Sequence, residues 1–425
     1  MRVLFTTLPG PTLLYFMAPL AWALRIAGHE VRVACEPDFV ETVTQAGLTA
    51  VPVGVGDEES AGDDEDDDEP ETGEVPAPYD AAVSPGSVEW EHMLTGYRGC
   101  TTGWHRPMND VLTADLVDFA RRWRPDLVLW EPCAFAGAIA AKACGAAHAR
   151  VMWCLDVFGV AREHFLRLKA ERPAGDHEDP LADWLAEEAA RYGFEFTEDM
   201  VTGHFTIEQL PPSIRLHAEG LDYLPLRYTP YGGPATVPDW LWAPPERPRV
   251  ALTLGLSLAV EIDRYAVDVQ GVIDAVADLD VELVATVHDS QRHTLTSIPD
   301  NVRVVPYVPL HHLAPTCAAV IHHAGAGTLA TTTLHGVPQL ALPWEFDEPM
   351  IADGLVRSGA GLALPATEAT GAAVRERLRG LLDEPAFRQG AGRLRDEMLA
   401  MPDPHEVVLR LEELAGKHRS APAGA

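Results

Sequence analysis

A short glycine-rich segment late in the chain carries the clearest chemistry. Residues 322–328 read His-His-Ala-Gly-Ala-Gly-Thr, where an apolar stretch meets the expected start of a helix. Glycines let a backbone approach an anion closely, and a helix N-terminus supplies free N–H groups with partial positive charge. We therefore predict a diphosphate cradle made by His323, Gly325, Gly327 and Thr328, without lysine and without a metal ion. An ordinary tight strand-to-helix turn is the other interpretation.

The same glycines allow a rival assignment. Gly325, Gly327 and Ala330 fit the G-x-G-x-x-G/A fingerprint of dinucleotide-binding proteins. That motif normally lies in the first strand–helix unit, with an acidic residue about 20 positions further on. Here the unit comes late in the chain, and the downstream acids follow Pro343-Trp344 instead. A nicotinamide-dependent dehydrogenase is therefore the weaker alternative.

Two further segments favour a nucleotide sugar as the ligand. Residues 307–310 follow an expected strand, and their backbone groups are placed to pair with a pyrimidine edge. Asp347 and Glu348 follow the strand after the cradle helix, and carboxylates there accept hydrogen bonds from sugar hydroxyls. In isolation these two acids would be assigned to a solvated loop. Their position after the cradle favours sugar binding.

The elements that must position these residues alternate as in a doubly wound α/β protein. In the first half we expect strands at 2–7, 29–35, 126–130 and 149–153, and helices at 12–27, 39–47, 111–123 and 137–144. In the second half we expect strands at 249–253, 282–287, 302–306, 318–322 and 339–342, helices at 267–279 and 328–335, and further helices over 350–415. Thr12 and Thr328 are the expected caps of their helices. Residues 160–215 are expected to be mostly helical.

A stretch rich in proline, glycine and aromatic residues divides the chain. It covers 226–247 and has the composition of a linker. The expected architecture is two Rossmann-like domains facing a cleft. These are an acceptor-binding domain over 1–225 and a nucleotide-sugar-binding domain over 248–415, followed by a disordered tail over 416–425.

Composition excludes several classes of protein. The 425 residues carry a formal charge of −32, which makes nucleic acid and anionic membranes poor partners. Twelve acidic residues and no basic one lie over 57–74, which predicts a solvated mobile loop at 56–75. A basic partner and a metal ion are the alternatives for that block. The six cysteines form no C-x-x-C pair, and no apolar run is long enough to span a membrane, so a cytoplasmic protein is expected.

Segments spread over nearly the whole chain resemble the GT-B-fold glycosyltransferases of family 1. Among these the chain is most similar to bacterial enzymes that glycosylate macrolide and aromatic polyketide antibiotics. The resemblance rests on the cradle and on RVL at 2–4, PLAWAL at 19–24, AGHEVRVA at 27–34, DLVLWEP at 126–132, VPDWL at 237–241 and LTLG at 252–255.

This resemblance implies a substrate pair and a set of contacts. It implies inverting, metal-independent transfer from a dTDP-deoxysugar to a hydrophobic polyketide aglycone, with no cofactor. Gly255 and Ser257 would lie near the diphosphate and Val308 would contact the base, while Asp347 and Glu348 would face the sugar. It also implies a cytochrome-P450-like activator protein without haem function, bound on the N-terminal domain. A homodimer is a further partner to be tested.

One departure from the family pattern concerns the general base. Relatives usually carry a histidine on the loop after the first strand, and the matching residue here is Leu13. Glu131, at the end of the strand 126–130, is the expected substitute, and its other reading is a structural carboxylate that normally orients the histidine. His92, His105 and His204 are further candidates, each of which is more commonly a surface histidine.

Leu13 leaves three hypotheses open. Glu131 serves as the base; or the acceptor is acidic enough to need little help, as a phenol or an aromatic carbon nucleophile would be; or the protein is a weak or inactive homologue that acts as a partner. The intact cradle favours an enzyme over the last of these. Another enzyme of the same fold, such as a sugar-nucleotide epimerase, is a smaller alternative.

Overall fold

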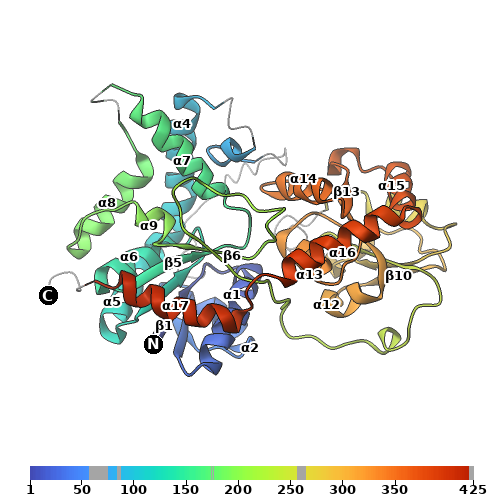
Figure 1. The fold of residues 1–425 in the computed structure, drawn as a ribbon, viewed down its shortest axis with the longest axis horizontal. Helices are drawn as coiled ribbons and strands as arrows, with labels where there is room; N and C mark the ends of the chain where they lie inside the picture. Colours follow the sequence, from blue (N-terminus) through green and yellow to red (C-terminus); the bar gives the residue numbers. More distant parts are fainter. Residues whose placement is uncertain (57–74, 84–87, 174, 176, 256–264, 421–425) are drawn as a thin grey trace. The chain divides into compact units, whose positions relative to one another are not determined.

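The computed structural model describes residues 1–56, 75–83, 88–173, 175, 177–255 and 265–420. They belong to two compact units (Figure 1). The first unit comprises Met1–Gln209, Leu216–Leu226 and Pro402–Ala425, and the second comprises Leu210–Arg215 and Arg227–Met401. The acidic block 57–74, and with it nearly all of the expected mobile loop, lies outside the described residues.

The first unit is built on a seven-stranded sheet in the order β3-β2-β1-β4-β5-β6-β7, and every neighbouring pair is parallel. The strands are β1 Arg2–Thr6, β2 Glu30–Cys35, β3 Ala50–Pro52, β4 Leu127–Trp130, β5 Ala147–Val151, β6 Thr206–Glu208 and β7 Tyr223–Pro225. Parallel strands are covered on both faces, which is why β1 and β4 are almost continuously apolar. The order reverses between β1 and β4, where open α/β sheets bind ligands.

Helices fill the connections of this sheet. They are α1 Pro11–Ile26, α2 Val40–Gln45, α4 Trp90–Cys100, α5 Arg106–Trp123, α6 Phe135–Cys144, α7 Val157–Ala170, α8 Pro180–Tyr192, α9 Asp199–Thr202 and α17 Pro404–His418, with 3₁₀ turns at Pro37–Phe39 and Tyr79–Ala82 and a π-helical turn at Thr101–His105. The prediction that Thr12 caps α1 is wrong. The helix begins one residue earlier, because Pro11 occupies its first position after Gly10, and no side chain caps it.

The last helix of the chain packs on the first unit. Helix α17 contacts α1 and β5, and the chain beyond it is held by a hydrogen bond from Ser420 N to Gly145 O at 3.1 Å. A capping box between Asp403 and Glu406 starts the helix. The domain limits therefore differ from the expected 248–415, because the apolar face of α17 is buried in the first unit. The expected disordered tail 416–425 is helical up to His418, and residues 421–425 lie outside the described part.

The second unit contains a six-stranded parallel sheet in the order β10-β9-β8-β11-β12-β13. Its strands are β8 Arg249–Thr253, β9 Glu282–Thr286, β10 Val302–Val305, β11 Cys317–His322, β12 Gln339–Ala341 and β13 Gly361–Ala363. Its helices are α11 Val269–Ala275, α12 Leu310–Leu313, α13 Ala326–Leu334, α14 Glu348–Ser358, α15 Gly371–Asp383 and α16 Pro385–Leu399, with 3₁₀ turns at Asp239–Leu241, Asp289–Thr294, Ala314–Thr316 and Ala366–Glu368.

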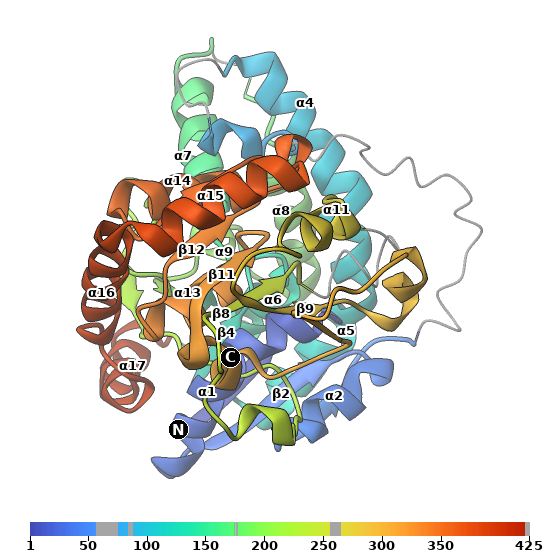
Figure 2. The ribbon, with the colours of Figure 1, turned by 90° about the vertical axis from the view of Figure 1, so that its right-hand side faces the viewer.

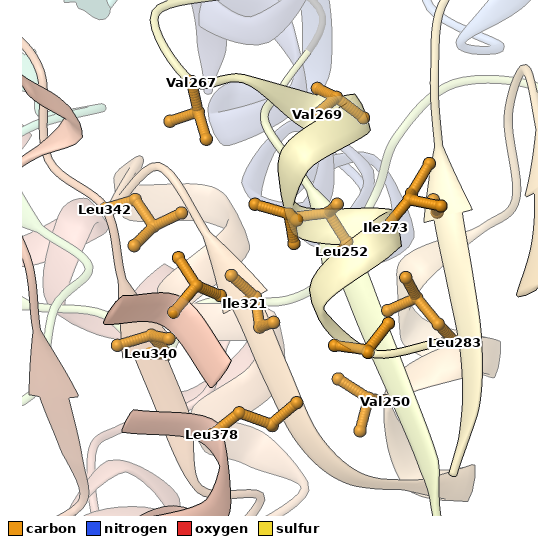
Figure 3. Close-up of a cluster of buried hydrophobic side chains, with 14 of the residues drawn as sticks. Val250, Leu252, Val267, Val269, Ile273, Leu283, Ile321, Leu340, Leu342 and Leu378 are labelled. Carbon is orange, nitrogen blue, oxygen red and sulfur yellow. The ribbon is translucent and has the colours of Figure 1, made fainter. Parts of the chain in front are cut away.

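The larger of two core clusters described in this unit lies between its sheet and two of its helices. Helix α15 packs on α11 and on strands β11 to β13 (Figure 2). Side chains of these elements interdigitate, with Leu252, Ile321 and Leu340 from the sheet facing Ile273 and Leu378 from the helices (Figure 3). Strand pairing holds the carboxyl ends of β8, β11 and β12 in register, because His322 pairs with Thr253 on one side and Ala341 on the other.

Three short strands, β6, β7 and β13, are not predicted from the sequence pattern. Strand β6 lies in the stretch expected to be mostly helical, β7 follows it, and β13 lies among the expected C-terminal helices. Each has three residues, too few for a periodic pattern to distinguish strand from helix. They form because each adds hydrogen bonds to an existing parallel sheet.

Candidate active site

The glycine-rich segment forms a turn between β11 and α13. Ala324 lies in the left-handed region with φ of 76°, and Gly325 is the N-cap of the helix. The first intrahelical hydrogen bond runs from Leu329 N to Gly325 O at 3.0 Å. The amides of Gly327 and Thr328 therefore belong to the first turn, where N–H groups are free to bind an anion. The prediction that Thr328 caps the helix is wrong, because the helix begins at Ala326 and Thr328 lies inside it.

The imidazole of His323 lies between two glycines. A Cβ atom on Gly255 would come within 2.9 Å of the ring, and one on Gly325 would collide with its Nε2. Gly255 also has φ of 77°, a conformation that other residues rarely adopt. The structure thus brings Gly255 beside His323, while Ser257 lies outside the described residues.

His323 faces a carboxyl group of the same unit. Its Nε2 is 3.9 Å from Oε1 of Glu348, and burial lowers the pKa of the imidazole to about 4. Burial raises the pKa of Glu348 to about 8. At pH 7 both groups are therefore mainly neutral, so this pair brings little formal charge to the cradle before a ligand binds.

The two acids after β12 have different environments. Glu348 begins α14, and its Oε2 accepts hydrogen bonds from the backbone N–H groups of Trp344 at 2.8 Å and Glu345 at 3.2 Å. This leaves Oε1 on the side of His323. Asp347 is buried at the N-cap position of the same helix. Both acids lie beyond the strand next to β11, so they share one end of the sheet with the cradle.

The side chain of Val308 is buried in a hydrophobic cluster of the second unit. It is buried there with Leu241, Val284 and Leu313. A contact between this residue and a nucleotide base therefore falls to its backbone, which follows β10 and precedes α12.

Glu131 lies at the switch point of the first sheet, directly after β4, and its side chain has 0% exposure. Its Oε2 accepts hydrogen bonds from Cys133 N at 2.9 Å and from Trp153 Nε1 at 3.1 Å. Burial raises the pKa of the carboxyl to about 7, although these two donors and a weaker interaction with the Leu8 backbone oppose the rise. A carboxyl group with this pKa can exchange a proton near neutral pH.

The other base candidates lie in varied surroundings. Leu13 is half-buried in the first turn of α1. His92 is 47% exposed and pairs with Asp80 at 2.7 Å, which agrees with a surface histidine. The surface assignment is wrong for His105, which is fully buried and hydrogen-bonded to the hydroxyl of Tyr79. It is also wrong for His204, because α9 and α17 pack around that ring.

A second cluster has the composition of a metal site. Single ligand atoms of His148, Asp199 and His204 lie within 4.8 Å of one another. The Nδ1 atoms of both rings accept hydrogen bonds, from Trp130 Nε1 in His148 and from the His148 backbone N–H in His204. Each neutral ring therefore carries its proton on Nε2, directed at Asp199, and the ammonium of Lys142 lies 3.1 Å from the same carboxylate. These groups satisfy one another as a hydrogen-bonded network.

Trp153 is a neighbour of Glu131 that the sequence motifs did not indicate. It follows β5, the strand beside β4, and donates to Glu131 from the adjacent strand end. The signal was available in the sequence, since carboxyl ends of neighbouring parallel strands meet at one edge of the sheet. The stretch was instead assigned to the strand itself, which ends two residues earlier than expected.

Family models cover most of the chain. Residues 22–255 match the N-terminal domain of erythromycin biosynthesis protein CIII-like proteins, and residues 270–414 match their C-terminal domain. No helix in the described part of the chain is long and apolar enough to cross a membrane.

Relatives with curated names match over nearly their full length. The chain is 45% identical to 10-deoxymethynolide desosaminyltransferase of Streptomyces venezuelae, with 100% of both chains aligned. It is 42% identical to the TDP-daunosamine transferase DnrS of Streptomyces peucetius, over 100% of this chain and 99% of that protein. Among solved structures, the glycosyltransferase VinC in complex with dTDP superposes with a TM-score of 0.87 at 40% identity, covering 98% of this chain and 100% of VinC. The expected fold class of two parallel α/β domains is thereby confirmed.

Proposed function

Because the chain belongs to the erythromycin biosynthesis protein CIII-like family and is a glycosyltransferase, we propose that it transfers a deoxysugar from a dTDP-sugar to a polyketide-type aglycone. The relatives named above use desosamine or daunosamine, and VinC was crystallised with dTDP. We further propose that the reaction inverts the anomeric centre and needs no metal ion.

The cradle is the observation that carries this proposal. Gly255, His323 and Gly325 meet at the carboxyl ends of β8 and β11, next to the first-turn amides of α13. This arrangement suits the diphosphate of a nucleotide sugar, because N–H groups and a helix N-terminus stabilise negative charge.

In the proposed reaction, an acceptor oxygen or carbon forms a bond to the anomeric carbon as the bond to the β-phosphate oxygen breaks. The electron pair leaves with dTDP, whose growing negative charge is stabilised by the preorganised N–H groups and by His323. The acceptor's proton passes to a general base. Asp347 and Glu348 would contact the sugar of the donor, and the backbone of Val308 would contact its thymine base.

Glu131 is our candidate for the general base. Its pKa of about 7 suits proton transfer near neutral pH. Its Oε1 is buried and has no hydrogen-bond partner among the described residues, which leaves an oxygen for the acceptor hydroxyl. Because the carboxyl is fully covered, an acceptor must displace its neighbours to reach it. The inactive-homologue alternative receives no support from the relatives, whose names describe transferases.

A titration of the purified protein with dTDP, compared with UDP and NAD, tests the donor assignment. We expect dTDP to bind most tightly, and His323→Ala to weaken binding by about tenfold or more, since a hydrogen bond to a charged group is worth about 1.5–3 kcal/mol. A preference for NAD, or no binding of dTDP, would refute the donor assignment. An activator protein and a homodimer remain proposals that the same preparation can test by size and by the effect of added partner on turnover.

A further inference from the structure

Trp153 covers one side of the carboxyl group of Glu131. The residue lies just beyond β5, it is only partly buried, and its indole N–H donates to Oε2 of Glu131 at 3.1 Å. The backbone N–H of Cys133 donates to the same oxygen at 2.9 Å. Both strong donors therefore act on one oxygen of the carboxyl group.

This asymmetry determines the orientation of the carboxyl group. Two donors hold Oε2, whereas Oε1 is buried and has no hydrogen-bond partner among the described residues; the Leu8 backbone interacts only weakly with the carboxyl group. A buried polar atom without a partner costs free energy, and such atoms occur where a ligand or proton will be bound.

The two donors differ in what a mutation can change. The Cys133 donor is a backbone group within a turn closed by a hydrogen bond from Ala134 N to Glu131 O at 2.9 Å, so it does not depend on the Cys133 side chain. The indole is the side-chain donor. Its ring also packs edge-on near Phe158, at a centroid distance of 6.5 Å, which holds the N–H in place.

We propose that Trp153 is the positioning residue of the general base, holding Oε2 of Glu131 so that the carboxylate form is favoured and Oε1 receives the acceptor's proton. The inference rests on the proposed role of Glu131. Trp153 takes no proton itself. It stabilises the ionised carboxylate through its N–H, because a hydrogen bond to a charged form favours that form.

The surroundings of Glu131 contain few groups that could imitate this effect. The titratable group that faces it is the thiol of Cys133, and burial raises the pKa of that thiol well above its usual value, so the thiol stays neutral. The shift of Glu131 itself arises from burial and hydrogen bonds, with no charged residue among its causes. Among the groups that lower the pKa of Glu131, the indole N–H of Trp153 is therefore the one that a side-chain substitution can remove.

The test compares Trp153→Phe with Trp184→Phe. The first variant keeps an aromatic ring and removes the donor. The second is a matched control, because Trp184 is 2% exposed and its indole nitrogen has no hydrogen-bond partner among the described residues. Ionisation of Glu131 is followed by infrared spectroscopy of its carboxyl band, which Glu131→Gln identifies by removing it. Turnover is measured from pH 6 to pH 10 alongside dTDP binding.

We expect Trp153→Phe to move the titration of Glu131 upward by about one pH unit. Turnover at pH 7 should fall about fivefold and recover to the wild-type level at high pH, because fewer carboxyl groups are ionised at pH 7. Trp184→Phe should leave the titration midpoint in place. Should Trp153→Phe fold poorly, replacing the indole with benzothiophene at this position removes the N–H and keeps the shape.

Two failures can be told apart. If Glu131→Gln abolishes the acid limb of the pH profile but Trp153→Phe leaves the titration unmoved, the inference is overturned and the proposed base role stands. The same holds if turnover of Trp153→Phe is reduced equally at every pH, as a structural role would require. If Glu131→Gln leaves turnover unchanged, the base role itself is refuted.

Discussion

At the scale of single residues, burial shifts the protonation of candidate carboxyl and imidazole groups in each of the two units. Glu131 and Glu348 have pKa values raised to about 7 and about 8, whereas the pKa of His323 falls to about 4. All three shifts have the same leading cause, which is that a buried environment disfavours the charged form. At pH 7 His323 and Glu348 are therefore mainly neutral, whereas the carboxyl group of Glu131 is close to half ionised.

The pH dependence of dTDP binding should show this for Glu348. Its pKa is raised, so the group is neutral below pH 8 and becomes negative as pH rises through about 8. A carboxylate beside a diphosphate is repulsive, so dTDP binding should weaken about three- to tenfold between pH 7 and pH 9. Calorimetry should show this in the wild type and find little change in Glu348→Gln. An equal loss in both proteins would assign the effect to another group.

Leu13 permits a gain-of-function test of Glu131. If Glu131 acts alone as a base, Leu13→His should change turnover little, since the carboxyl already takes the proton. If Glu131 is instead a carboxylate that orients a histidine, Leu13→His should raise turnover by about tenfold or more at neutral pH. The double variant Leu13→His with Glu131→Gln distinguishes the two, because only in the second case does it lose the gain. Leu13→Asn controls for the polar substitution.

At the scale of elements, the ends of parallel strands decide where the chemistry lies. Glu131 and Trp153 follow β4 and β5, while Gly255, His323 and Asp347 follow β8, β11 and β12. Within each unit, strand register therefore determines which of these residues lie side by side at the end of the sheet.

Helix α17 offers a test at this scale. Leu411 has 0% exposure, whereas Leu409 on the same helix is 64% exposed. Leu411→Ala should destabilise the first unit by about 2–5 kcal/mol, and Leu409→Ala should change stability by less than about 0.5 kcal/mol. Urea unfolding, followed with near-ultraviolet circular dichroism, measures both. Equal effects would show that α17 does not dock on this unit as described.

At the scale of the whole molecule, the donor cradle and the candidate base belong to different compact units. The cradle is assembled entirely from the second unit, so dTDP binding should be measurable without an acceptor. Glu131 and Trp153 belong entirely to the first unit. Variants of Glu131 should therefore alter turnover much more than dTDP affinity.

The sequence alone predicted the two-domain fold, the family and the position of the glycine-rich turn. The turn between a strand and a helix at residues 322–328 was predicted from glycine and histidine spacing, because a chain that brings backbone to an anion needs residues without side chains at defined positions. That this turn binds a diphosphate stays a prediction. The two-domain α/β fold followed from the alternation of apolar runs with helical segments. The family resemblance, which the comparisons confirm, identified a glycosyltransferase.

Only the tertiary structure decided the environments of the side chains. The sequence does not show that Glu131 is fully covered, that Trp153 donates to it, or that Glu348 uses one oxygen on the backbone while the other faces His323. Nor does it show that the last helix returns to the first unit. Apart from the bonds of Glu348 to the nearby backbone, these contacts join residues far apart along the chain, and periodicity, which records only local preference, cannot specify them. Hydrogen bonding and the pKa of a buried group depend on such neighbours, so they are determined by the folded chain.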